Sequence, residues 1–192
     1  MVVGYITKQI INSARSHGGL VTTWDMNARG VSSDSLLHWA RRHGDYVKFG
    51  HGIYEFDALN EKENINTDDQ QWFMPLAQAR DPQAYLAGIT VLDFYNLGYV
   101  AVNFSLVRAH TTRKHIGSGE TVIEPLRPTD RVDTVRGVRL QNLAQALNEA
   151  RPINADYLKQ AIEDAYERNL ITDSDHDQLT NCPKHAVKEG AQ

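Results

Sequence analysis

Apolar positions in the first sixty residues follow helical spacing three times and then two strand-like runs. The spacing predicts helices over residues 5–14, 24–28 and 32–42, each followed by a glycine that ends it. Thr22 or Thr23, and later Ser32 or Ser33, are placed to cap the second and third helices. Two β-rich runs, 46–49 and 53–56, flank Gly-His-Gly and predict a hairpin.

This order of elements is that of a winged helix-turn-helix. In that motif the helix after the tight turn enters the DNA major groove, and the ribbon lies over neighbouring backbone or the minor groove. In the third helix, Leu36, Trp39 and Ala40 form an apolar stripe that we expect to pack inward. The residues expected to contact DNA lie on its other faces and on the ribbon, and they are Ser32, Ser33, Ser35, His38, Arg41, Arg42, Lys48 and His51.

The predicted contacts differ in kind. The serines stand at a helix start, where hydroxyls and free backbone N–H groups meet phosphate, whereas Arg41 is suited to a bidentate pair with guanine. The alternative is a protein-docking or purely structural winged domain. It stays open because residues 1–60 hold six Lys and Arg against five Asp and Glu, a weak positive balance.

The polar stretch 60–71 divides the chain. It predicts a linker, or the solvated start of the next helix, between a winged domain at 1–59 and an α+β domain at 72–181, with a flexible tail at 182–192. In the second domain we expect helices at 69–79, 84–95, 143–149 and 155–168 and a last one capped by Asp173 or Ser174, with strands at 99–108, 121–123 and 135–140. The predicted fold class is α+β, an N-terminal winged helix-turn-helix followed by a mixed α/β C-terminal domain.

Composition narrows the class of protein. With 192 residues, 41% hydrophobic and 23% charged, the chain has ordinary globular composition. Its one cysteine, Cys182, forms no disulfide framework. The apolar run 84–102 carries Asp93 near its middle, which argues against a membrane span, and the N-terminus lacks signal-peptide features. We therefore expect a cytoplasmic protein without a membrane partner.

Charge alternates in blocks along a chain whose net charge is −4. The block 102–145 holds seven Lys and Arg against four Asp and Glu. Its basic residues predict one positive face for an acidic partner or for DNA backbone, the alternative being surface charges neutralised by neighbouring acids. They are Arg108, His110, Arg113, Lys114, His115, Arg127, Arg131, Arg136 and Arg139.

Catalytic motifs are hard to find in the sequence. It has neither a glycine-rich phosphate loop nor a paired-histidine zinc motif, and no carboxylate stands between His110 and His115. The alternating Asp173, Asp175 and Asp177 lack the glycine and glutamate of a calcium loop. We therefore predict no enzyme activity, metal or cofactor. A nuclease would need acids clustered with a basic residue around a position such as Asp93.

Several segments resemble a known family. Residues 21–56 (VTTWDMNARGVSSDSLLHWARRHGDYVKFGHGIYEF) resemble the N-terminal domain of AbiEi-type antitoxins from bacterial abortive-infection (type IV toxin–antitoxin) systems. Gly30-Val31-Ser32, Arg41-Arg42 and Gly52-Ile53-Tyr54 stand where that family has its turn, basic helix end and wing closure. Segment 84–92 is similar to the family's buried helix, with Ile-Thr-Val-Leu in place of an S-A-L-like stretch, and 137–147 to its strand-to-helix segment.

The resemblance implies a protein with two roles. The winged domain would repress its own operon by binding double-stranded operator DNA, alone or by dimerisation or cooperative binding. The C-terminal domain would neutralise a cognate toxin of nucleotidyltransferase fold, without a stable complex being required. The alternatives are a protein-interaction module with a docking winged domain and, since the family's second half has been compared with nuclease-like folds, a nuclease.

Overall fold

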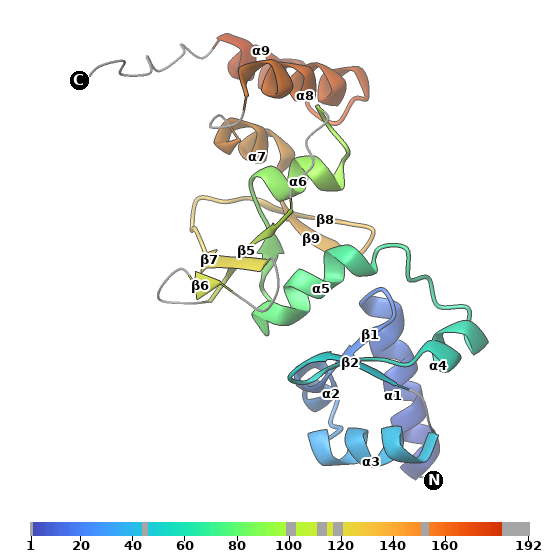
Figure 1. Ribbon diagram of the computed structural model, residues 1–192. Helices are drawn as coiled ribbons and strands as arrows, with labels where there is room; N and C mark the ends of the chain where they lie inside the picture. Colours follow the sequence, from blue (N-terminus) through green and yellow to red (C-terminus); the bar gives the residue numbers. More distant parts are fainter. Residues whose placement is uncertain are drawn as a thin grey trace.

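The computed structural model describes residues 2–43, 46–98, 103–110, 115–116, 121–150 and 154–181. Over these residues the chain is a mixed α/β protein with helices and two β-sheets, one of three strands and one of six. Figure 1 shows the small sheet and its helices at one end of an elongated molecule, with the large sheet in the middle and the last helices at the other end.

The N-terminal unit has the predicted three helices and hairpin, with one further strand. Its elements are α1 (Val2–Ser16), β1 (Leu20–Thr22), α2 (Thr23–Ala28), α3 (Ser33–His43), β2 (Val47–Gly50) and β3 (Ile53–Glu55). The strands lie in the order β1-β3-β2 and pair antiparallel. Three residues are too few to show an alternating pattern, and all three of β1 are buried, so this strand was not predicted.

Both predicted helix caps are confirmed. The backbone N–H of Asp25 donates to Thr22 Oγ1 at 3.2 Å, at the start of α2. The backbone N–H of Ser35 donates to Ser32 Oγ, also at 3.2 Å, at the start of α3. Each cap satisfies an amide that has no partner within its helix, which explains why both helices begin where the sequence predicts.

The small sheet joins two hydrophobic cores because its two faces point in opposite directions. Val21 and Tyr54 pack with α1 and α3 in the N-terminal core. Leu20 and Ile53 belong instead to the larger core, which also contains Phe73 of α5 (Gln70–Ala79). The two units therefore share a packed boundary.

The stretch 60–71 was predicted as a linker or as the solvated start of the next helix. Helix α5 does begin within it, at Gln70, but its first half is not a solvated linker. Helix α4 (Asp57–Lys62) extends into it, and Asn60 is buried with its side-chain amide donating to the carbonyl of Gly19 at 3.2 Å. Ile65 is buried in the N-terminal core. The sequence could not predict these contacts, because only Asn60 and Ile65 are buried within this mostly polar stretch, and two buried positions give no periodic pattern.

The large sheet is mixed, in the order β6-β7-β5-β4-β9-β8. Its strands are β4 (Tyr85–Leu86), β5 (Ser105–Ala109), β6 (His115–Ile116), β7 (Thr121–Pro125), β8 (Val132–Val135) and β9 (Val138–Gln141). Strand β4 runs parallel to β9, and β5 runs parallel to β7. Helix α5 packs against β4, β5 and β7 and also contacts β1 of the small sheet.

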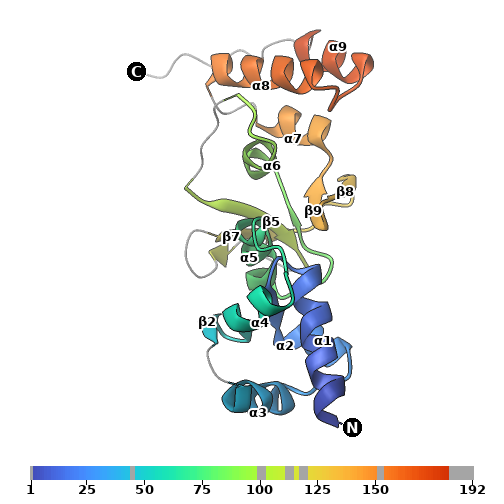
Figure 2. The same ribbon diagram turned by 90° about the vertical axis from the view of Figure 1, so that its right-hand side faces the viewer.

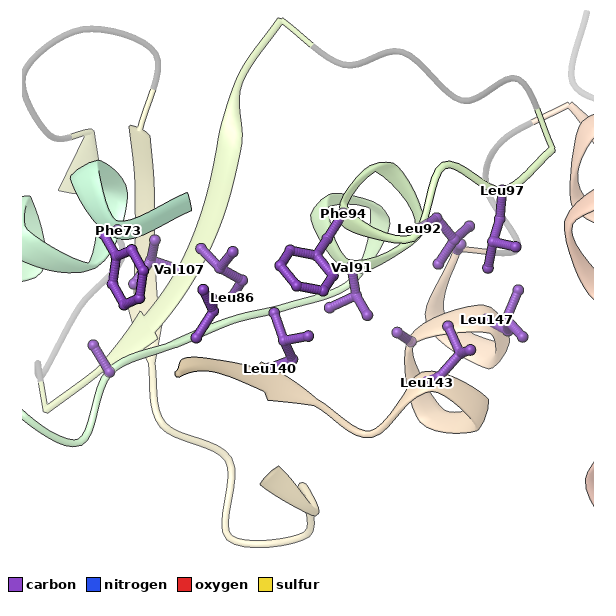
Figure 3. Close-up of a cluster of buried hydrophobic side chains, with 14 of the residues drawn as sticks. Phe73, Leu86, Val91, Leu92, Phe94, Leu97, Val107, Leu140, Leu143 and Leu147 are labelled. Carbon is purple, nitrogen blue, oxygen red and sulfur yellow. The ribbon is translucent and has the colours of Figure 1, made fainter. Parts of the chain in front are cut away.

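Helix α6 (Ile89–Phe94), which lies between β4 and β5 in the chain, packs against α7 (Leu143–Glu149), which follows β9. Helices α8 (Ala155–Glu167) and α9 (Asp173–Asn181) pack together beyond α7, at the far end from α3 (Figure 2). The core between sheet and helices is shown in Figure 3, where labelled side chains are Phe73, Leu86, Val91, Leu92, Phe94, Leu97, Val107, Leu140, Leu143 and Leu147. None of the described helices is long and apolar enough to cross a membrane.

Two segments of the second half, each predicted as a single helix or strand, contain two elements in the structure. The expected helix 84–95 is wrong in its first part, which is strand β4, and only α6 is helical. The run is buried almost throughout, so periodicity could not separate a strand from a helix. The expected strand 135–140 is a hairpin of β8 and β9, whose turn at Arg136-Gly137 has φ values of 51° and 82°. Two positive φ values are typical of the tight turns that suit hairpins.

Two further expectations are corrected in detail. Residues 99–102 of the predicted strand 99–108 lie outside the described part of the chain. Within the described part, the strand begins at Ser105. The last helix is capped by Thr172 rather than Asp173 or Ser174. Thr172 Oγ1 accepts from the Asp175 N–H and the Asp175 carboxylate accepts from the Thr172 N–H, each at 3.2 Å.

Candidate nucleic-acid interface

Helix α3 is held by its inner face. Leu36, Trp39 and Ala40 are buried, as the apolar stripe predicts. The indole N–H of Trp39 donates to Thr7 Oγ1 of α1 at 2.9 Å, and its ring meets Phe56 edge-on at 5.3 Å. A directed hydrogen bond together with an aromatic contact fixes how the helix is rotated about its axis. The side chains on its opposite face therefore have a fixed outward direction.

That outward face carries His38, Arg41 and Arg42, all exposed to solvent. None of the three makes a hydrogen bond or ion pair to any described residue. Asp34, one turn before His38, is exposed on the same helix. Both views place α3 at the end of the molecule opposite α8 and α9 (Figures 1 and 2). The last helices therefore leave this face open.

The serines at the start of α3 mainly hold each other. Ser32 Oγ donates to Ser35 Oγ at 2.9 Å and accepts the Ser35 N–H. Ser32 is exposed, whereas Ser33 and Ser35 are half-buried. The helix start thus has a rigid cap, and Ser32 is the serine most open to solvent.

The hairpin of β2 and β3 is tied to the beginning of α2. The backbone N–H of Thr23 donates to the carbonyl of Gly52 at 2.9 Å. Gly52 has φ +77°, and a Cβ atom there would lie 2.4 Å from Thr23 Oγ1, so only glycine permits this approach. Lys48 and His51 are exposed on this hairpin and pair with no described residue.

The predicted basic face of the second half is wrong at its first residue. Arg108, on β5, is only 1% exposed. Its guanidinium contacts the Asp130 carboxylate, donates to Glu149 Oε2 at 2.7 Å and lies 3.7 Å from Glu124 Oε2. Burial alone would lower the pKa of Arg108, but its hydrogen bonds to Glu149 and Asp130 raise that pKa above its ordinary value.

We refer to Arg108, Asp130, Glu149, Glu124 and Arg127 as the Arg108 ion cluster. Arg127 lies at its exposed rim, 2.7 Å from Glu149 Oε1 and 3.5 Å from Glu124 Oε2. The buried Tyr85 closes the other side, because its hydroxyl donates to Asp130 Oδ2 at 2.8 Å, and burial raises the pKa of Tyr85 to about 12. These residues come from separate strands, loops and a helix, and no sequence spacing could have grouped them.

The remaining basic residues of that stretch do not form one face either. Arg136 pairs with Asp69 at 3.3 Å and lies over the Phe94 ring, while His110 pairs with Asp81. Arg139 is half-buried and Arg131 is exposed. Arg113, Lys114 and the side chain of His115 lie outside what the structure describes. The alternative, charges neutralised by neighbouring acids, holds for most of the described arginines.

The candidate catalytic groups stay scattered. Asp93 is half-buried on α6, where burial raises its pKa. Over the described ranges, no group of three or more His, Cys, Asp or Glu is arranged to hold a metal ion. The carboxylates of the Arg108 ion cluster are paired with arginine.

Comparison with known proteins adds no assignment. No model of a known protein family matches the chain, and no curated protein shows significant similarity to it. The chain's own geometry therefore bears on function. The main contrast is between the exposed, unpaired cations around α3 and the arginines of the second half, of which Arg108, Arg127 and Arg136 are paired with acids.

Proposed function

We propose that residues 2–56 form a winged helix-turn-helix that binds duplex DNA, with α3 as the recognition helix and the β2–β3 hairpin as the wing. The observation that carries this proposal is the outward face of α3, where Arg41 and Arg42 are exposed and unpaired. An arginine already paired with a carboxylate gains little from a phosphate. An unpaired one displaces the counterions that surround DNA, which drives association.

The geometry suggests a division of labour. Ser33, His38 and Arg41 read base edges in the major groove, since Ser33 stands at the start of α3 and His38 and Arg41 lie on its exposed side. The phosphate contacts come from the remaining residues of the set, which are Ser32, Ser35, Arg42, Lys48 and His51. The bond between Thr23 and Gly52 keeps the wing at a constant position relative to α2.

The biological role we propose is that of a bacterial antitoxin that represses its own operon. It rests on the resemblance to AbiEi-type antitoxins, supported by the order of helices and strands over residues 2–56. In this role the protein is cytoplasmic and not an enzyme, binds its operator alone, as a dimer or cooperatively, and counteracts a nucleotidyltransferase-like toxin through its second half.

Binding to the DNA upstream of the gene tests the proposal, measured by fluorescence anisotropy over a range of salt concentrations. The two permanent cations assigned to phosphates, Arg42 and Lys48, predict a slope of log affinity against log salt concentration near −2, at about −0.9 per phosphate contact. Arg41→Ala should weaken binding by about 1–3 kcal/mol and relax the preference at one base position. Lys48→Ala should weaken binding evenly across sequences.

Arg131→Ala is the matched control, because Arg131 is exposed in the second half, away from α3. It should leave affinity unchanged. The DNA interface would be refuted if affinity did not change with salt concentration, or if Arg131→Ala and Arg41→Ala lowered affinity equally.

The antitoxin role needs its own experiment. The proposed role requires a nucleotidyltransferase-like toxin gene in the same operon. Co-expression with that toxin should restore growth for the wild type and for Arg41→Ala alike, since α3 lies at the end of the molecule opposite the last helices. Repression of a reporter driven by the operon's promoter should be lost only in Arg41→Ala. Failure of the wild type to restore growth would remove the antitoxin role and leave the DNA interface standing.

A further inference from the structure

Strand β2 exposes apolar side chains at the edge of its sheet. Val47 is 44% exposed and Phe49 is 42% exposed. The strand pairs only with β3, so its other side has no partner strand among the described residues. Exposed edge strands usually carry charges that discourage association, so a bare phenylalanine at this position calls for a partner.

Phe49 occupies a β-bulge. Lys48 pairs with Tyr54 and Gly50 pairs with Ile53, so one step along β3 corresponds to two steps along β2. Phe49 is the extra residue and has no counterpart across the ladder. A bulge of this kind re-aims a side chain and is often found next to functional sites.

The surroundings of Phe49 are basic and fixed in place. Residues 47–52 (VKFGHG) contain Lys48 and His51 and no acid. The turn after Phe49 is held to α2 by the Thr23–Gly52 hydrogen bond and by the close approach at Gly52. The apolar ring lies between two cationic or donor groups on a ribbon that is hydrogen-bonded to α2. This setting suits a polyanion with stacked aromatic bases better than an apolar protein surface.

We infer that Phe49 is a minor-groove wedge. Its ring enters the minor groove beside the segment that α3 contacts and partly unstacks one base step, while Lys48 and His51 hold the flanking phosphates. Proteins that bind this groove use apolar side chains in this way, and pyrimidine–purine steps open most readily. The inference rests on the proposed DNA interface and adds a residue that acts by stacking rather than by charge.

The experiment compares Phe49→Ala with Phe104→Ala, a second exposed phenylalanine (38%) located in the other half of the molecule. The duplex carries 2-aminopurine at the step that the wing reaches, and affinity is measured by anisotropy. Wild type and Phe104→Ala should raise 2-aminopurine fluorescence on binding. Phe49→Ala should bind roughly 5- to 100-fold more weakly and abolish that rise, as expected for loss of one stacking contact. Phe49→Trp should keep the affinity, with tryptophan emission quenched by DNA.

The possible outcomes distinguish failure of the Phe49 wedge from failure of the proposed DNA binding. If the wild type binds and Phe49→Ala matches it in affinity and 2-aminopurine signal, the wedge is wrong and the DNA interface stands. If the wild type does not bind DNA, both fail. If sedimentation shows that Phe49→Ala abolishes self-association while DNA affinity is unchanged, Phe49 is a contact between copies of the chain, and the wedge is likewise overturned.

Discussion

Replacement of Arg108 by methionine tests whether the second half depends on its buried ion cluster. Methionine keeps much of the side-chain volume but removes the charge that neutralises Asp130, whose side chain is only 4% exposed. Glu149 and Glu124 lie nearer the surface and retain Arg127. Asp130 retains the hydrogen bond from Tyr85 but has no cation to replace the lost one within the cluster.

The expected loss follows from that asymmetry. Breaking a buried pair by removing one partner costs about 3–5 kcal/mol, mostly because the other charge is left uncompensated. For a chain of this size that corresponds to a fall in melting temperature of roughly 6–20 °C. Arg127→Met removes a half-exposed arginine that contacts the same glutamates, and should cost about 1 kcal/mol or less.

Urea unfolding followed by circular dichroism and tryptophan fluorescence measures both variants under the same conditions. The double variant Arg108→Met/Asp130→Asn also removes the carboxylate that is left without a cation. Its free energy of unfolding should be more than about 1 kcal/mol higher than that of Arg108→Met. If Arg108→Met proves no more costly than Arg127→Met, or if the double variant recovers nothing, the cluster does not stabilise the fold in the way that its burial indicates.

Two further variants test single features. Gly52→Ala should lower stability by about 1–2 kcal/mol or more, because an alanine at positive φ is strained and its Cβ meets Thr23 Oγ1; thermal unfolding measures this, and unchanged stability would contradict the close approach. For Tyr85 the folded-state pKa is raised to about 12, so the neutral form is favoured and wild-type stability should fall as pH rises from about 10 towards 12. Tyr85→Phe lacks that titration, so its stability deficit, which comes from the lost bond to Asp130, should narrow between pH 8 and pH 11 in urea unfolding; a constant deficit would contradict the raised pKa.

The sequence predicted the N-terminal unit better than the second half, and the reason is the range of the interactions. Helix caps at Thr22 and Ser32 join residues three apart, and the stripe of Leu36, Trp39 and Ala40 repeats within one turn. Such signals are complete within a short window. The directions of Arg41 and Arg42 follow from the same stripe, so the exposed face of the candidate interface was visible before the structure. That this face binds DNA stays a prediction.

The second half shows where local patterns fail. Segment 84–95 is buried almost throughout, so its strand and helix could be told apart only by the neighbours that each part meets. Arg108 looks like any surface arginine in sequence, and its partners Asp130 and Glu149 lie 22 and 41 positions further along the chain. Tyr85 was predicted on a helix but lies on strand β4, where its hydroxyl donates a hydrogen bond to Asp130.

The amino-acid pattern by itself determined which positions of the first helices turn inward, where those helices begin, and which basic side chains are left on the outside. The tertiary structure decided which of the remaining charges are free: it buried Arg108, paired Arg127 and Arg136, and left Arg131 exposed. The physical reason is that a charge's state depends on the solvent and countercharges around it, and the fold brings those together from strands and loops that are distant in the sequence.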